Sequence, residues 1–113
     1  MKKVETIIRK SKFSMVKKAL HEVGVNFFSY WDVSGVGVEK VDNDVLSNGT
    51  VTISDIERCF LSIIVNDDFE EVTIKAILES ASSGKIGDGI LIVSSIDEVY
   101  RIRTGEKGSN ILR

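Results

Sequence analysis

The stretch VETIIRKSKFSMVKKALHEVG, residues 4–24, decides the first half of the fold. Residues 4–9 are mainly β-branched and predict a half-buried strand. Ser11 can then cap a helix, because apolar residues recur after it at the spacing of one helix face, and Gly24 can end that helix in a left-handed conformation. The stretch therefore predicts a strand followed directly by a helix.

The rest of the chain repeats this order. Because strand–helix–strand crossovers are right-handed, two such units place both helices on the same face of one sheet. The order β-α-β-β-α-β predicts an α+β fold, a ferredoxin-like sandwich, in a single domain over residues 1–113. The further elements we expect are an extended stretch at 25–38, a strand at 56–65, a helix begun by Asp67 or Asp68 and ended by Gly84, a strand at 90–93 and an extra short strand at 99–103.

The composition narrows the class of protein. The chain has 113 residues, 42% of them hydrophobic, which suits one packed domain. Its 15 Lys and Arg are balanced by 17 Asp and Glu, so nucleic-acid binding driven by overall charge is not expected. No apolar run reaches the roughly 20 residues of a membrane span, and the first residues do not resemble a signal peptide. The single cysteine, Cys59, suits a reducing compartment, so we expect a cytoplasmic protein.

The expected second and third strands carry apolar residues on both sides. The helices cover only one face of the predicted sheet. An apolar face that no helix covers usually meets another subunit, so we expect an oligomer.

Residues 83–89, SGKIGDG, connect the second predicted helix to the strand after it, and we call them the glycine loop. Glycines let backbone N–H groups approach a ligand closely, as in loops that cradle phosphate. An ordinary helix-to-strand connection is the alternative, and the spacing alone does not choose between the two. The loop is not a P-loop, because the GxxxxGK[ST] pattern is absent and a helix precedes it.

Arg101 and Arg103 are two positions apart in the expected short strand at 99–103. Strand periodicity would place both guanidinium groups on one side, roughly 6–7 Å apart along the chain. Such a pair suits a chain of phosphates. A charged edge strand that discourages aggregation explains the same pattern equally well.

Residues from about 38 to 55 are polar and show no apolar periodicity. A loop of this length is usually functional or mobile. Its acidic residues are too sparse to favour a hard-metal site. No nucleophile in the chain has a base placed by an identifiable motif, so we do not expect an enzyme.

Taken together, these segments resemble the PII signal-transduction family, the trimeric nitrogen-regulatory proteins. The opening MKKVETIIR is similar to the first strand of that family, residues 84–89 to its B-loop, and residues 101–106, RIRTGE, to its C-terminal loop. The resemblance spans nearly the whole chain. It implies a homotrimer that binds ATP or ADP in clefts between subunits, with AMP as a further candidate. It also implies control of a partner, a membrane transporter or a metabolic enzyme, through a long T-loop at about residues 38–55.

The resemblance further implies a nucleotide site divided between two subunits. One subunit supplies the glycine loop and the base of the T-loop, and its neighbour supplies the arginine pair. Two isoleucines match positions that enclose the adenine, and a serine matches a hydroxyl contact to it. The matching nucleotide-binding positions are Ile7, Ser29, Gly35, Gly37, Ile64, Gly87, Asp88, Gly89, Arg101 and Arg103.

Several positions depart from the family pattern. Val38 replaces an arginine, and Ile90 replaces the lysine that reaches the phosphates. Glu39 replaces a glutamine that helps to bind 2-oxoglutarate, although Arg58 keeps the cation of a family lysine. Val51 replaces the tyrosine that some members have uridylylated. We therefore expect a divergent member that binds adenine nucleotide without 2-oxoglutarate sensing or uridylylation.

Two other functions stay open from the sequence. A trimeric small-ligand or metal-binding module of the same fold would need His or Cys ligands, and the chain has one of each, far apart. A weak nucleotide hydrolase would need a base and a metal cluster, and the sequence shows no motif for either. Titration with ATP, ADP, AMP and 2-oxoglutarate would separate these functions.

Overall fold

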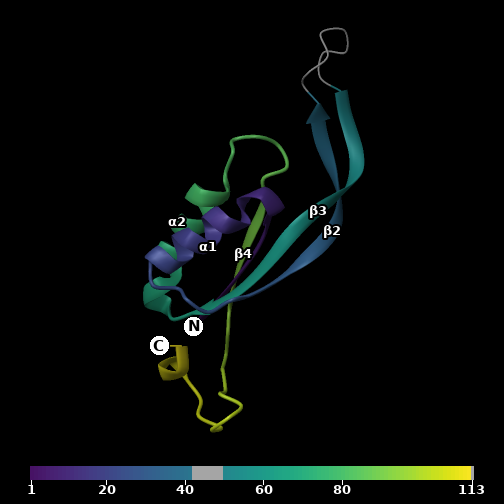
Figure 1. Ribbon diagram of the computed structural model, residues 1–113. Helices are drawn as coiled ribbons and strands as arrows, with labels where there is room; N and C mark the ends of the chain where they lie inside the picture. Colours follow the sequence, from purple (N-terminus) through teal and green to yellow (C-terminus); the bar gives the residue numbers. More distant parts are fainter. Residues whose placement is uncertain (42–49, 113) are drawn as a thin grey trace.

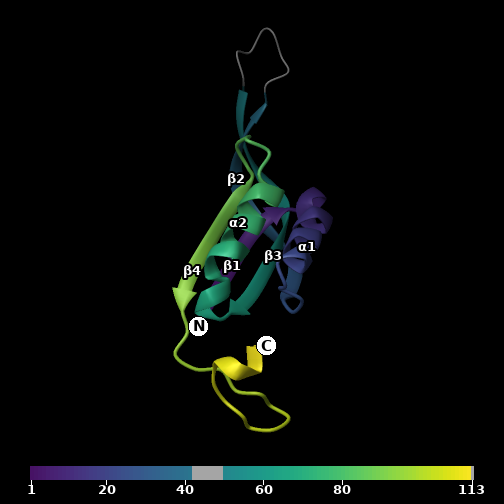
Figure 2. The same ribbon diagram turned by 90° about the vertical axis from the view of Figure 1, so that its left-hand side faces the viewer.

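The computed structural model describes residues 1–41 and 50–112. In this part of the chain two α-helices cover one face of a four-stranded sheet with the strand order β2-β3-β1-β4 (Figures 1 and 2). All neighbouring strands are antiparallel. This arrangement confirms the ferredoxin-like α+β sandwich. Its elements are β1 (Lys2–Arg9), α1 (Phe13–Glu22), β2 (Ser29–Val41), β3 (Thr50–Val65), α2 (Glu70–Ala81) and β4 (Gly89–Ser95).

The core lies between the sheet and the two helices. Side chains alternate across a strand, so alternate residues from Val4 to Ile8 of β1 and from Cys59 to Val65 of β3 point toward the helices and are buried. The helices pack apolar side chains at helical spacing against this face. The buried apolar residues of these elements are Val4, Ile8, Val16, Leu20, Cys59, Leu61, Ile63, Val65, Ala76, Ile77 and Ala81.

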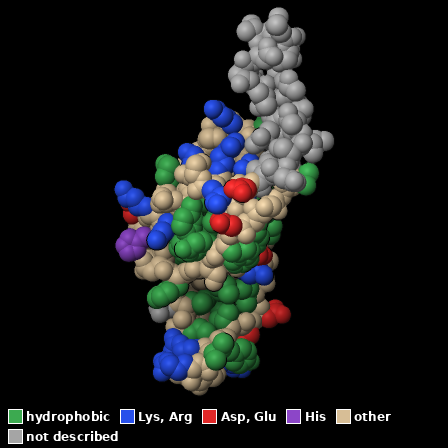
Figure 3. Space-filling model, turned by 45° about the vertical axis from the view of Figure 1, so that its right-hand side comes forward, with side chains coloured by type: hydrophobic (Ala, Val, Ile, Leu, Met, Phe, Trp, Pro, Cys, Tyr) green, Lys and Arg blue, Asp and Glu red, His purple; other side chains and the backbone are tan. Residues whose placement is uncertain are grey.

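The opposite side of the sheet, which we call the open face, is also apolar. The β1–β4 register pairs Ile7 with Ile90, and Trp31 of β2 stacks on Phe60 of β3 with ring centroids 4.7 Å apart. Ile90 is 58% exposed and Ile92 is 44% exposed, which is unusual for large aliphatic side chains on a sheet. Figure 3 shows a band of hydrophobic side chains on the surface. The open face therefore supports the expected contact with another subunit.

Strands β2 and β3 are longer than the sequence predicts. Their pairing continues from Ser29 opposite Ser62 to Val41 opposite Thr50, so much of the expected 38–55 loop is a two-stranded ribbon. Figure 1 shows this ribbon running past the ends of the helices. Val36 and Val38 on β2, and Val51 and Ile53 on β3, alternate with glycine or polar residues, and this strand signal was missed in the prediction. Residues 42–49 of the expected loop lie outside the described residues.

The prediction of a short strand at 99–103 is wrong. Tyr100 forms a single bridge with Lys107, and residues 102–104 form a turn. The N–H of Arg101 donates to the carbonyl of Glu106 at 2.7 Å, and that of Gly105 donates to the carbonyl of Arg101 at 2.8 Å. These bonds close a tight turn, because Gly105 adopts φ +72° and reverses the chain where a strand would continue.

Both helices begin differently from the prediction. Each is preceded by a short 3-10 turn, Lys10–Lys12 before α1 and Asp67–Phe69 before α2. The N-cap position of α1 is therefore Lys12, where Ser11 was expected, and that of α2 is Phe69, where an aspartate was expected. Gly24 follows the end of α1 with φ +89°, as its position predicted.

Candidate functional site

The glycine loop is held in shape by one carboxylate. Asp88 accepts the N–H of Ser83 at 2.8 Å and that of Gly84 at 3.0 Å, and it also accepts the Ser83 hydroxyl. Arg9 Nε donates to Asp88 Oδ1 at 3.1 Å. The bonds from Ser83, with those from Arg9 and Gly84, hold the pKa of Asp88 well below its usual range. The carboxylate is therefore a fixed anion that ties both ends of the loop together.

Two arginines attach this loop to the sheet. Arg9 and Arg58 lie opposite each other on β1 and β3. Arg9 Nη2 donates to the carbonyl of Ile86 at 2.9 Å, and Arg58 Nη2 donates to the carbonyl of Gly87 at 3.1 Å. Like charges placed opposite each other in a sheet repel, and these acceptors offset that repulsion. We call Arg9 and Arg58 the arginine clamp.

The clamp fixes the glycines at conformations that other residues avoid. Gly87 has φ +99° and Gly89 has φ +103°. A Cβ atom on Gly89 would stand 1.7 Å from the carbonyl oxygen of Ile7, so the backbones of β1 and β4 approach closely there. The glycines carry no side chain, so their backbone can approach an anion closely, as in anion-binding loops, although Lys85 and Ile86 of the same loop have exposed side chains.

Six of the ten expected site residues lie at this end of the sheet, which we call the loop end. Arg9, Arg58 and Val33 stand side by side on β1, β3 and β2. Two residues further along β2, Gly35 pairs with Ile56. Gly87 and Asp88 are placed here by their hydrogen bonds to Arg58 and Arg9, and Gly89 by its pairing with Ile8. The residues at the loop end are Ile7, Gly35, Gly37, Gly87, Asp88 and Gly89.

The remaining four residues lie toward the opposite end of the sheet. Ile64 pairs with Lys3, whereas Ile7 pairs with Phe60. Four residues of strand separate the two isoleucine positions by about 13 Å. A single chain therefore does not place both isoleucines around one adenine. Ser29, opposite Ser62, and the turn with Arg101 and Arg103 belong to the Ile64 end.

The arginine pair sits on a turn, so its expected strand-like spacing does not hold. Arg101 Nη1 lies 3.4 Å from a carboxylate oxygen of Glu106. Arg103 is exposed in the turn at 102–104. Arg101 also lines a hollow of about 670 Å³ together with Phe27 and Ile64. The arginines and the glycine loop therefore lie at opposite ends of the folded domain.

Sequence reasoning missed the arginine clamp. Arg58 was identified only as a retained cation, and Arg9 only as the end of a strand. The β1–β3 register places Arg9 and Arg58 side by side, although they are far apart in the sequence. Without the strand pairing, no local pattern marks the two arginines as a unit.

Other kinds of site find little support in the described residues. Over residues 1–41 and 50–112 there is no group of three or more His, Cys, Asp or Glu side chains that could hold a metal ion. Burial, chiefly, raises the pKa of the Cys59 thiol, as for an inert core cysteine. No helix in the same residues is long and apolar enough to cross a membrane.

The chain is similar in sequence and in structure to nitrogen regulatory proteins. A family model described as "Nitrogen regulatory protein P-II" matches residues 1–106. A curated protein of that name from Azospirillum brasilense is 36% identical over 112 residues, which is 99% of this chain and 100% of the relative. Another from Bradyrhizobium diazoefficiens is 38% identical over 108 residues, 96% of each chain. A solved structure of B. subtilis GlnK, 27% identical, superposes with a TM-score of 0.79 over 96% of both chains.

Proposed function

The chain belongs to the nitrogen regulatory protein P-II family, whose members are signalling regulators and not enzymes. We propose that it is a homotrimer that binds adenine nucleotide in clefts between its subunits. The expected ligands are ATP, ADP and AMP. The regulator is expected to act in the cytoplasm on a partner protein, either a membrane transporter or a metabolic enzyme, through the segment at residues 38–55.

The observation that carries this proposal is the division of the candidate site between two ends of one chain. The glycine loop, held by Asp88 and the arginine clamp, provides a preformed backbone surface at the loop end. Arg101 and Arg103 provide cations at the other end. A phosphate chain can meet both only if a second copy brings its arginines to the first copy's glycine loop.

The open face gives a reason for the copies to associate. Ile90, Ile92 and Trp31 are between 44% and 58% exposed in the single chain. Burying such side chains contributes roughly 25 cal/mol per Å² of apolar surface removed from water. A closed ring of identical chains would bury this face and repeat the same divided site at each interface.

The proposal includes the loss of 2-oxoglutarate sensing. Glu39 adds a carboxylate where the family has a neutral amide, and like charges oppose binding of a dianion. The guanidinium of Arg58 is already bonded within the chain, because its Nη2 donates to the carbonyl of Gly87 and its Nη1 donates to the carbonyl of Glu57. Val51 offers no hydroxyl to a uridylylating enzyme. The chain is therefore expected to respond to nucleotide identity alone.

Isothermal titration of the full chain tests the proposal. ATP, ADP and AMP are titrated separately, with and without 2-oxoglutarate. Changing both Arg101 and Arg103 to Ala should weaken nucleotide binding about a hundredfold, because each guanidinium contributes charge-assisted bonds. Lys107→Ala, which removes an exposed cation of the same tail, is the matched control and should leave the affinity unchanged. Equal affinity in the double variant and the wild type would refute the role given to the arginines.

A further inference from the structure

The outer face of α1 carries a charge that the rest of the chain does not share. Residues 10–21 contain four lysines and a histidine and no acidic residue, although the whole chain has a net charge of −2. The 3-10 turn before α2 and most of α2, residues 67–79, contain five acidic residues and one lysine. The two helices that form the outer layer of the sandwich therefore have opposite charge. Figure 3 shows Lys or Arg side chains next to the histidine on this layer.

Two of the four lysines are paired with acidic residues of the same chain. Lys10 is paired with Asp32 at 3.3 Å, and Lys18 stands 3.9 Å from Glu22 with 80% of its side chain exposed. Within the described residues, Lys17 has no acidic partner within 4.0 Å. His21 is exposed, and its Nδ1 lies 2.6 Å from Asn26 Oδ1, which fixes the ring beside the lysines.

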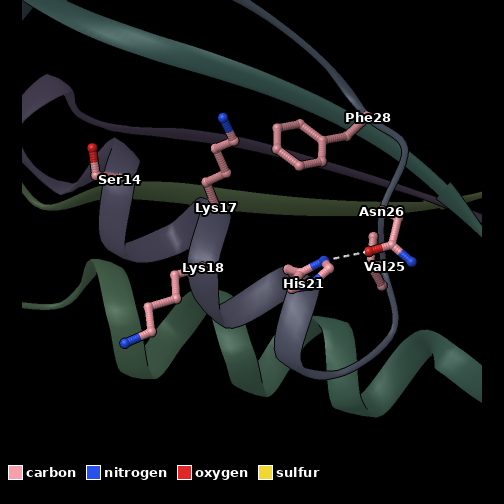
Figure 4. A pocket seen from close by; sticks show the side chains of 7 residues that line it. All are labelled: Ser14, Lys17, Lys18, His21, Val25, Asn26 and Phe28. Carbon is pink, nitrogen blue, oxygen red and sulfur yellow. Dashed lines mark hydrogen bonds between the residues drawn. The ribbon is translucent and has the colours of Figure 1, made fainter.

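The same face contains a shallow hollow of about 460 Å³ between α1 and the chain that leads into β2. Its apolar lining comes from Val25, which is buried in the core, and from Phe28, which is partly buried and packs against the core. Figure 4 shows Lys17 and Phe28 pointing to the same side, Lys18 pointing the other way toward α2, and His21 bonded to Asn26. An apolar surface bordered by ammonium groups fits an apolar side chain with carboxylates on either side of it.

We propose that this face of α1 is a docking site for an acidic segment of a partner protein, which places an aromatic side chain in the hollow and its carboxylates beside Lys17 and Lys18. The site is separate from the glycine loop, and it borders the hollow that Arg101 lines, because Val25 and Asn26 line both hollows. Its α1 residues lie on the helix side of the sheet, opposite the open face (Figure 2).

The charge of α2 favours a short peptide segment over a larger polyanion. A duplex nucleic acid or an anionic bilayer that reached α1 would also face acidic side chains of the adjacent helix, among them Asp68 and Glu71. Those charges repel phosphate over about 8–10 Å at physiological salt. A segment of a few residues can contact α1 and avoid α2, and a concave apolar hollow accepts a single side chain better than a flat lipid surface.

The test is an amide NMR titration of the full-length, nitrogen-15-labelled protein. The probe is a blocked pentapeptide with a central phenylalanine and two glutamates on each side. We expect shifts concentrated at residues 13–28. Replacing the phenylalanine of the probe with alanine should raise the Kd several-fold. Raising the salt from about 50 to about 300 mM should also weaken binding several-fold, because exposed charges are screened.

Charge reversal supplies the matched variants. Lys17→Glu with Lys18→Glu should raise the Kd about tenfold or more, because two attractive contacts become repulsive. Lys75→Glu is the control, since Lys75 on α2 stands 3.9 Å from Glu79, as Lys18 does from Glu22. It should change the Kd less than twofold. Shifts outside residues 13–28, or no loss of affinity in the double reversal, would overturn the proposal. So would equal or tighter binding of duplex DNA or of phosphatidylserine vesicles.

Discussion

Replacing Gly89 with Ala should destabilise the protein by at least about 2–3 kcal/mol. Three costs contribute. A φ of +103° disfavours any residue with a Cβ atom by roughly 1–2 kcal/mol. The new Cβ would stand 1.7 Å from the Ile7 carbonyl oxygen, so β1 and β4 must separate locally. That separation strains the neighbouring bond from the buried Thr6 hydroxyl to the Ile90 carbonyl, 2.9 Å long, which contributes about 1 kcal/mol.

Two other glycines separate these costs. Gly84 has a φ of +76°, and a Cβ atom there would stand in open space. Gly84→Ala should therefore lower the free energy of unfolding by the backbone conformational cost alone, about 1 kcal/mol. Gly35→Ala has open space, and its φ lies outside the left-handed region, so it should change stability by less than about 0.5 kcal/mol.

Urea unfolding at one fixed protein concentration measures all three variants, with the fluorescence of Trp31 as the signal. If Gly89→Ala is no less stable than Gly84→Ala, the close approach of β1 and β4 does not limit that position. The inferred geometry of the glycine loop would then be wrong.

Further predictions concern ligand choice, assembly and pH. Glu39→Gln combined with Ile90→Lys should restore binding of 2-oxoglutarate with Mg-ATP, measured by calorimetry; micromolar 2-oxoglutarate binding by the unmodified chain would contradict this. Ile92→Asp should convert the trimer to monomer in light scattering, because it places a charge in the apolar open face, and a trimer that persists would place the interface elsewhere. The pKa of Asp88 is depressed in the folded state, so its stabilising effect is present above about pH 4, its unfolded value, and is lost as the pH falls toward the folded value. Acid unfolding of Asp88→Asn should therefore depend less steeply on pH than that of the wild type, and identical curves would show that the carboxylate does not stabilise the loop.

The fold was accessible from the sequence because its core elements have clear periodicity. Apolar residues of α1 recur at helical spacing, and β1 is rich in β-branched residues, so both were placed within a few residues. The long ribbon of β2 and β3 was not predicted. In its outer half Val51 and Ile53 alternate with Thr and Ser, which is a strand signal that the glycine-containing, largely polar segment obscured.

The candidate site was predicted in part. The glycine loop was found from composition, since three glycines in six positions require special backbone geometry. The spacing of Arg101 and Arg103 was inferred from a strand that the structure replaces with a turn, because Gly105 reverses the chain. The arginine clamp depends on pairing between strands distant in sequence, and that pairing becomes visible only in three dimensions.

The continuity of β3 restricts how a partner at the ribbon could influence the glycine loop. This one strand of 16 residues runs from the ribbon, through Arg58 of the clamp, to Ile64 at the other end of the fold. It cannot slide along its axis, because a shift of one residue would turn Leu61 and Ile63 out of the core and expose them to water. A mechanical signal along β3 must therefore travel as twist or bend. Rotation of the strand about its own axis would swing the guanidinium of Arg58 relative to the carbonyl of Gly87 and leave the buried register intact.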